Sequence, residues 1–266
     1  MTGPIPLGLP ELAAAASLIL VNGLLSLWLG LGLEKRLLVA SVRTVVQLLI
    51  LGAILVPVFR WEHPGPVVAM GMLMVMLAAW EAIRRTARRF RGMYGAALTS
   101  MLVGAGGTAL LGTAAIVGVD PWWQPQYFIP LLGMILGNAL TGISLGLDRT
   151  MDMLDDGRGR VETRLAWGAT AWEAARPVAA EALRTGMIPI INSMSAVGLV
   201  TIPGMMTGQI LSGTAPALAA RYQILIMFLV AGATALGTAL SVLLTVRVMF
   251  DREHRLRIDK LRKVSG

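Results

Sequence analysis

Hydrophobic and polar positions alternate along this chain in long blocks. Apolar runs of roughly 20 residues, the length needed to cross a hydrocarbon core of about 30 Å as an α-helix, are separated by short segments that carry most of the charge. This pattern predicts an all-α, polytopic membrane protein with a single transmembrane domain over 1–266. Seven spans are expected, at about 10–33, 37–59, 67–83, 93–118, 127–147, 187–213 and 222–249.

The charge distribution predicts how these spans are oriented. Only 14% of residues are charged, against about 25% in soluble domains. Lys and Arg gather at 34–36, at 84–92, in the loop 148–185 and from Arg247 onward. Seven spans place these segments on one side, which the positive-inside rule assigns to the cytoplasm. We therefore expect the N-terminus outside and a basic cytoplasmic tail over 250–266, and we interpret the net charge of +8 as an orientation signal and not as a sign of nucleic-acid binding.

The sixth predicted span is interrupted by residues that a plain membrane anchor does not need. The stretch "INSMSAVGLVTIPGMMTGQILSG" (191–213) contains Pro203 followed by Gly204. Proline removes a backbone donor, so we predict that these two residues break the span and that the freed backbone faces protein or water. Broken spans with polar residues at the break form transport sites. The candidate pathway residues here are Asn192, Ser193, Met194, Met205, Met206, Thr207 and Gln209.

The paired methionines allow two interpretations. Thioethers are soft metal ligands, which makes Met205 and Met206 candidate ligands for a transported metal. Methionine is also an adaptable filler of cores, and the chain has 16 of them. The sequence leaves both readings open and favours core packing for any single methionine.

Five further polar residues lie within predicted spans, where they are costly. Arg43 and Gln47 share one helical face at i,i+4, and Arg43 either faces protein or extends to the headgroups. Glu81 precedes Arg84 and Arg85, so it forms a local ion pair or takes part in transport. Asn138, together with Thr141, is expected to bond across helices.

The loop 148–185 is too small for a domain and is predicted to be helical. Its first part continues span five, "GRGR" (157–160) is expected to turn, and one or two short helices follow, interrupted near Pro177. Trp167 and Trp172 give it two large apolar side chains. A helical hairpin lying on the membrane surface is the simplest alternative. The acidic residues Asp148, Asp152, Asp155 and Asp156 share one helical face, which suits a solvated face paired with arginines better than a cation site.

Catalytic patterns give no support for an enzyme. No G-x-x-x-x-G-K-[ST] or H-E-x-x-H sequence occurs, and there is no cysteine. "GISLG" (142–146) matches G-x-S-x-G, but that motif needs a strand–turn–helix context and here lies in an apolar span. Gly142 and Gly146 are better explained as small residues that let another helix approach, continuing Gly133 and Gly137.

Several stretches resemble a known family of transport proteins. "GLVTIPGMMTGQILSG", "SVRTVVQLLILG" and "GNALTGISLGLDR" are similar to the FetB/YbbM-type family of bacterial iron-export ABC permeases and to plant half-type ABC membrane subunits involved in aluminium tolerance. The resemblance implies a non-catalytic permease in the bacterial inner membrane that works as a homodimer. It also implies a separate P-loop ATP-binding subunit, which binds ATP and Mg²⁺, so that no cofactor is expected in this chain.

The same resemblance implies a role for part of the cytoplasmic loop. "LAWGATAWEAARP" (165–177) is similar to the segment by which ABC permeases contact their ATPase. The likeness lies in its Gly-Ala pair and the following Glu-Ala, and the residues expected to couple to the ATPase are Trp167, Gly168, Ala169, Trp172, Glu173 and Arg176. Metal export, of iron in particular, is then the expected activity; a passive channel or a scaffold without an ATPase is the alternative.

Overall fold

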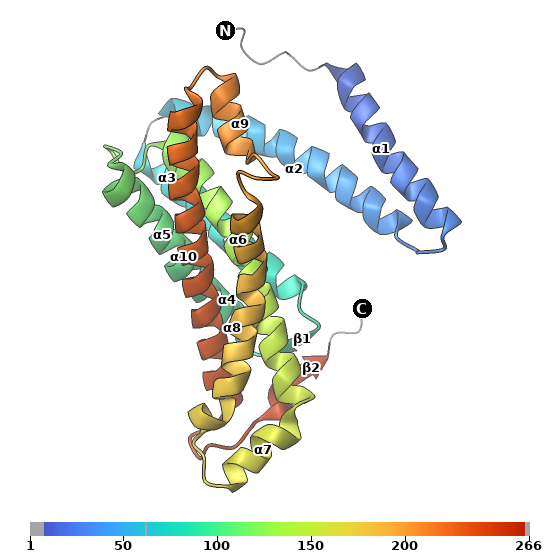
Figure 1. Ribbon diagram of the computed structural model, residues 1–266, viewed down its shortest axis with the longest axis vertical. Helices are drawn as coiled ribbons and strands as arrows, with labels where there is room; N and C mark the ends of the chain where they lie inside the picture. The colour runs from blue at the N-terminus through green and yellow to red at the C-terminus, as the bar shows by residue number, and fades with distance from the viewer. Residues whose placement is uncertain (1–7, 62, 264–266) are drawn as a thin grey trace. The chain divides into compact units, whose positions relative to one another are not determined.

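The computed structural model describes residues 8–61 and 63–263, and helices dominate it (Figure 1). Six of the described helices are long and apolar enough to cross a membrane, which confirms the polytopic all-α class. The α-helices are α1 (Leu9–Trp28), α2 (Glu34–Trp61), α3 (Pro64–Arg84), α4 (Met93–Met101), α5 (Gly107–Leu110), α6 (Pro125–Asp155), α7 (Arg158–Ala166), α8 (Ala171–Ala196), α9 (Gly204–Leu211) and α10 (Pro216–Met249). Two π-helical segments, η1 (Leu102–Gly106) and η2 (Leu111–Val117), continue α4 and α5 as one span-length element.

The chain divides into two compact units. The first contains residues 1–62 and 208–215, and the second contains residues 63–207 and 216–266. In the first unit, α1 and α2 are joined by a turn that Ser26 organises. Its hydroxyl donates to the Glu34 carboxylate at 2.9 Å and accepts from the Leu33 N–H at 3.0 Å. Gly30 and Gly32 take positive φ in this turn.

In the second unit, α6 packs against α3, α8 and α10. One buried apolar cluster joins Leu154 at the end of α6, Val161 of α7, Ala174 near the start of α8 and Met249 at the end of α10. Helices α6 and α10 therefore end together, and α8 begins where they end. It follows that α8 runs antiparallel to both and carries the chain back alongside them.

Glycines bring these three helices into close contact. A methyl group added at Gly142 of α6 would lie 2.5 Å from Thr234 Cγ2 and 3.1 Å from the Gly186 carbonyl oxygen. One added at Gly186 of α8 would lie 2.6 Å from Thr238 Cγ2. Helices α6, α8 and α10 thus meet where two backbones approach and threonines fill the gap, as small residues allow in membrane bundles.

The predicted boundaries need three corrections. The break predicted in span six is present but wider than expected, because α8 ends at Ala196 and α9 begins at Gly204. The segment 157–160 is mostly helical, since α7 starts at Arg158. Helix α8 also runs through Pro177 without interruption. Proline costs a helix one hydrogen bond, but Ala174, Ala175 and Val178 pack in the buried cluster, and such packing supplies most helical stability in proteins.

Two short strands tie the chain's last described residues to the loop between α3 and α4. β1 (Arg88–Phe90) and β2 (Leu261–Lys263) pair antiparallel, with a short 3₁₀ helix, η3 (Ile258–Lys260), before β2. Three basic segments thus meet at one end of the second unit: residues 84–92, the α7–α8 region and residues 250–263. We call this the basic end. The predicted tail is therefore folded onto the unit through residue 263.

Substituting Gly142 with alanine should destabilise the second unit, because the new methyl group meets Thr234, Thr238 and the Gly186 backbone. Overpacking of this kind costs about 1–3 kcal/mol. Thermal unfolding in detergent should show a lowered midpoint. Gly137→Ala, five residues earlier on the same helix, is the matched control, since nothing lies within 4 Å of its added methyl group. Equal midpoints for the two variants would contradict the proposed packing.

Candidate functional site

The connection between α7 and α8 is a sharp turn at the basic end, formed by residues 167–170; we call it the elbow (Figure 1). Gly168 adopts φ +89°, the left-handed conformation that glycine takes most easily. Its N–H donates to the Leu165 carbonyl at 2.9 Å, and the Ala169 N–H donates to the Arg164 carbonyl at 3.1 Å. This pair of bonds is the Schellman arrangement, which ends a helix and satisfies its last carbonyls.

A capping box at Thr170, the residue after Ala169, starts helix α8. The Thr170 hydroxyl accepts from the Glu173 N–H at 3.3 Å, and the Glu173 carboxylate accepts from the Thr170 N–H at 2.8 Å. The backbone bond from Thr170 is the main cause that holds the pKa of Glu173 below its ordinary value. Glu173 is therefore anionic at neutral pH. The sequence T-A-W-E is typical of such a box. The turn is tight because the signal that ends α7, at Gly168, is followed within two residues by the one that begins α8, at Thr170.

The elbow presents its aromatic side chains to the outside. Trp167 is 85% exposed and Trp172 is 48% exposed. Gly168, Glu173 and Arg176 are exposed as well, while Ala169 is half-buried. All six residues predicted to contact an ATPase therefore lie on or next to one turn. An exposed tryptophan at the tip of a structured turn is typical of a binding surface, because aromatic side chains are enriched in interface cores.

The tail supports the elbow from one side, which the sequence did not reveal. The Ala171 N–H donates to His254 Nδ1 at 3.2 Å. The Asp251 carboxylate accepts from the N–H groups of Arg255, at 2.8 Å, and Glu253, at 3.0 Å, and these bonds lower the pKa of Asp251. A cavity of about 440 Å³ separates α7 from the tail. Its lining residues are Glu162, Leu165, Ala169, Glu253, His254, Arg255 and Leu256.

The interruption after α8 spans residues 197–203, and its backbone is bonded locally. The Ala196 carbonyl accepts from the N–H of Val200 at 3.0 Å and of Thr201 at 3.3 Å. Gly198, at φ +81°, donates to the Thr201 carbonyl at 2.9 Å. Pro203 precedes α9, and its carbonyl accepts the Thr207 N–H at 3.0 Å. The break therefore begins earlier than predicted and ends, not starts, at Pro203 and Gly204.

The predicted pathway residues fall on both sides of this break. Asn192, Ser193 and Met194 occupy the last turns of α8, and only Met194 is half-buried. Met205, Met206 and Thr207 occupy the first turn of α9, with Gln209 following. A methyl group at Gly204 or Gly208 would meet nothing within 4 Å. Arg43 and Gln47 are exposed on α2 of the first unit.

Two other candidates make local interactions. Glu81 lies 4.0 Å from Arg84 Nη1 and 3.8 Å from Arg85 Nε, as expected for the local ion pair. Asn138 and Thr141 were expected to bond across helices, and that bond stays a prediction. Their side chains donate to Met134 and Gly137 carbonyls of their own helix, at 3.0 and 3.3 Å. A carbonyl four residues back is always within reach of such side chains in a helix.

The acidic face at the end of α6 is paired with Arg88 of β1. The Arg88 guanidinium donates to Asp152 at 2.7 Å, to Asp155 at 2.8 Å and to Asp156 at 2.9 Å. Burial by itself lowers the pKa of Arg88, but these carboxylates outweigh it and raise the pKa above its ordinary value. The expected pairing with arginine is confirmed. Among residues 8–61 and 63–263, no group of three His, Asp or Glu side chains is placed to hold a metal ion.

These features define a polytopic helical membrane protein with an exposed turn between two helices at its basic end. The chain belongs to the family described as "Uncharacterised protein family (UPF0014)", whose model matches residues 9–250. It is 37% identical to the UPF0014 membrane protein slr1647 of Synechocystis, over 87% of this chain and 89% of that protein. No solved structure matches the chain.

Two relatives have names that refer to transport or to metal sensitivity. The chain is 30% identical to the probable iron export permease protein FetB of Escherichia coli, over 95% of this chain and 96% of that protein. It is 32% identical to the protein ALUMINUM SENSITIVE 3 of Arabidopsis thaliana, over 94% of this chain and 90% of that protein. The resemblance inferred from the quoted stretches is thereby confirmed.

Proposed function

We propose that this chain is the membrane permease subunit of an ABC transporter that exports a metal ion such as iron. It works as a homodimer in the bacterial inner membrane, and a separate P-loop subunit binds and hydrolyses ATP with Mg²⁺. The name of the Escherichia coli relative supports the permease role and the cargo. The observation that carries the proposal is the elbow, because a docking site for a partner needs a surface that is both rigid and exposed.

The elbow has both properties. The Schellman bonds and the capping box fix its backbone on either side, and the His254 contact supports it from the tail. Trp167, 85% exposed, has lost almost none of its apolar surface to the rest of the chain. Inserting it into a groove of an ATPase would bury an aromatic anchor at little conformational cost.

Helix α8 connects the elbow to the break. It has 26 residues, so it extends about 39 Å at 1.5 Å per residue. Its capping box lies next to the elbow, and its last carbonyl begins the interrupted segment. A displacement of the elbow by an ATPase would move α8 as a rigid body and change the position of the break. Shifts of packed helices are a known means of switching.

The break also supports a homodimer. Its loop exposes Leu199, Val200 and Ile202, at 87%, 83% and 68%. Irregular backbone at membrane depth requires protein or a water-filled cavity beside it. A second copy of the chain would supply that protein surface and would close a transport path between the two breaks. Met205 and Met206, just past the break, would then offer thioethers to the metal.

Replacing Trp167 with aspartate should release the ATPase. Loss of a central aromatic anchor costs about 2 kcal/mol or more, a roughly 30-fold weaker interaction. The loss of the complex is measured by co-purification of the ATPase with the permease from cells that express both subunits. Trp167→Phe is the control and should retain the complex, because it keeps an aromatic side chain in the same place. An intact complex with the aspartate variant would exclude the elbow as the docking site.

The double variant Met205→Leu and Met206→Leu tests the role of the thioethers. Leucine nearly preserves side-chain volume, so insertion and assembly should be normal. If the sulfur atoms bind the cargo, iron(II) should no longer stimulate ATP hydrolysis by the reconstituted complex. Normal stimulation would show that the two methionines only fill space, and the permease role would stand unchanged.

A further inference from the structure

A second basic surface lies on the ribbon of β1 and β2, away from the elbow. The strand register places Arg89 directly opposite Arg262 and Arg88 directly opposite Lys263. Like charges on directly opposed residues destabilise a strand pair. Each pair therefore needs a source of negative charge, and alternation along the strands sends the two pairs to opposite faces of the ribbon.

One face has that negative charge in the protein itself. Arg88 bonds to three carboxylates at the end of α6, and Lys263 Nζ lies 3.5 Å from Asp155. Phe90 and Leu261 share this face, and Phe90 is buried. This side of the ribbon is therefore both anchored and neutralised by α6.

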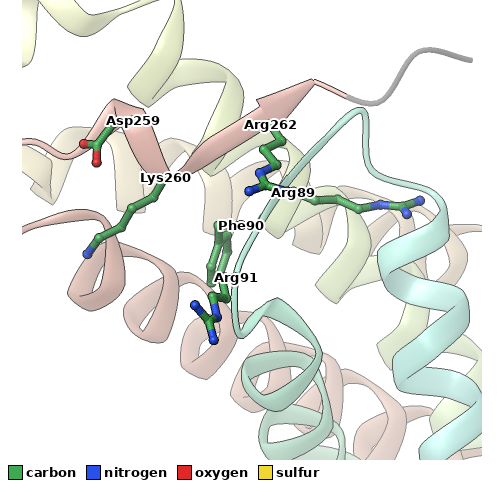
Figure 2. Close-up of a pocket in the computed structure, with 6 residues that line it drawn as sticks. All are labelled: Arg89, Phe90, Arg91, Asp259, Lys260 and Arg262. Atoms are coloured by element: carbon green, nitrogen blue, oxygen red, sulfur yellow. The ribbon is translucent and has the colours of Figure 1, made fainter.

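Beside the other pair lies a pocket in which positive charge prevails, and it is not confined to one face of the ribbon, because Phe90 also lines it. Its volume is about 570 Å³. Figure 2 shows Arg91, Arg262 and Lys260 arranged around Phe90, with the guanidinium of Arg89 directed away from Lys260. The complete lining is Arg89, Phe90, Arg91, Asp259, Lys260 and Arg262.

The single carboxylate of this pocket does not neutralise it. The Asp259 carboxylate forms a bidentate ion pair with the Arg257 guanidinium, which donates two hydrogen bonds of 3.0 Å each. Lys260 Nζ donates to the Val248 carbonyl at 2.7 Å, which is a neutral acceptor. Arg89 Nε is buried and has no hydrogen-bond partner among the described residues. A buried donor of this kind requires an acceptor.

The location of the pocket indicates which anions reach it. β1 lies four residues after Arg84, where α3 ends, and three residues before Met93, where α4 begins. Both helices belong to span-length elements, so the pocket lies at the height of the lipid headgroups. Basic pockets beside the ends of membrane helices bind phosphate-bearing headgroups, and guanidinium groups match phosphate oxygens in pairs.

We propose that this pocket binds a phosphate group, held by Arg91 and Arg262 with Lys260 at its edge and with Arg89 turning its guanidinium toward the bound anion. An anionic phospholipid headgroup and a soluble phosphate share this chemistry. The bound phosphate would neutralise the Arg89–Arg262 pair and would stabilise the strand pair that holds the tail against the α3–α4 loop. This site is independent of ATPase docking at the elbow.

The test uses the full chain purified in an uncharged detergent. Calorimetric titration with short-chain phosphatidylglycerol is compared with phosphatidylcholine, whose choline offsets the phosphate charge, and with inorganic phosphate. The triple variant R89Q/R91Q/R262Q should bind phosphatidylglycerol more weakly by about fivefold for each charge removed. The control R160Q/R164Q/R252Q removes the same charge from exposed positions outside the pocket and should bind as the unmodified chain does.

The outcomes separate the two sources. Tight binding of phosphatidylglycerol alone identifies a lipid site, and equally arginine-dependent binding of inorganic phosphate identifies a soluble ligand. If neither anion binds, or if the pocket and control variants lose affinity equally, the proposal is overturned. Should the triple variant fail to fold, R262E changes a single exposed side chain and must also weaken binding for the proposal to stand.

Discussion

The close contact of α8 with α6 and α10 is the constraint on which the rest of this structure depends. At Gly142 and Gly186 the two backbones approach so closely that no side chain fits between them, and Thr238 of α10 covers both. This contact lies near the middle of α8. The same helix has the elbow before its first residue and the interrupted segment after its last. Because α8 is packed so closely at this point, it is expected to move as one rigid piece, which joins its two ends mechanically.

Both ends of α8 obey a second constraint, which is that backbone polar groups need partners. At the elbow, the Schellman bonds at Gly168 satisfy the last carbonyls of α7. The capping box of Thr170 and Glu173 satisfies N–H groups at the start of α8. At the break, the Ala196 carbonyl and Gly198 bond to backbone groups inside a tight loop. Each turn is therefore well defined without help from outside, and its exposed apolar side chains, Trp167 and Leu199, remain available for protein neighbours.

Features encoded by local pattern could be predicted from the sequence. Apolar blocks indicated the membrane helices, and Pro203 with its glycines indicated an interruption. The extent of the break was missed, because it depends on the turn at Gly198. Continuity of α8 through Pro177 was missed as well, since packing against distant helices overrides a local breaker. Arg88 and His254 were not recognised as partners of the acidic face and of the elbow. Their contacts join residues more than 60 positions apart in the sequence. Helix and strand periodicity predicts contacts only between residues a few positions apart.

The central claim is that an ATP-binding subunit docks at the elbow. The chain has no cysteine, so one can be introduced as a unique cross-linking site. Ala166→Cys, exposed at the end of α7 and next to an intact Trp167, is treated with a short thiol-to-amine cross-linker in membranes that contain the ATPase and should yield a covalent complex of the two subunits. Gln126→Cys, exposed at the start of α6 and so far from the basic end, should yield none. A cross-link at residue 126, or its absence at residue 166 in a complex that co-purifies, would contradict the account.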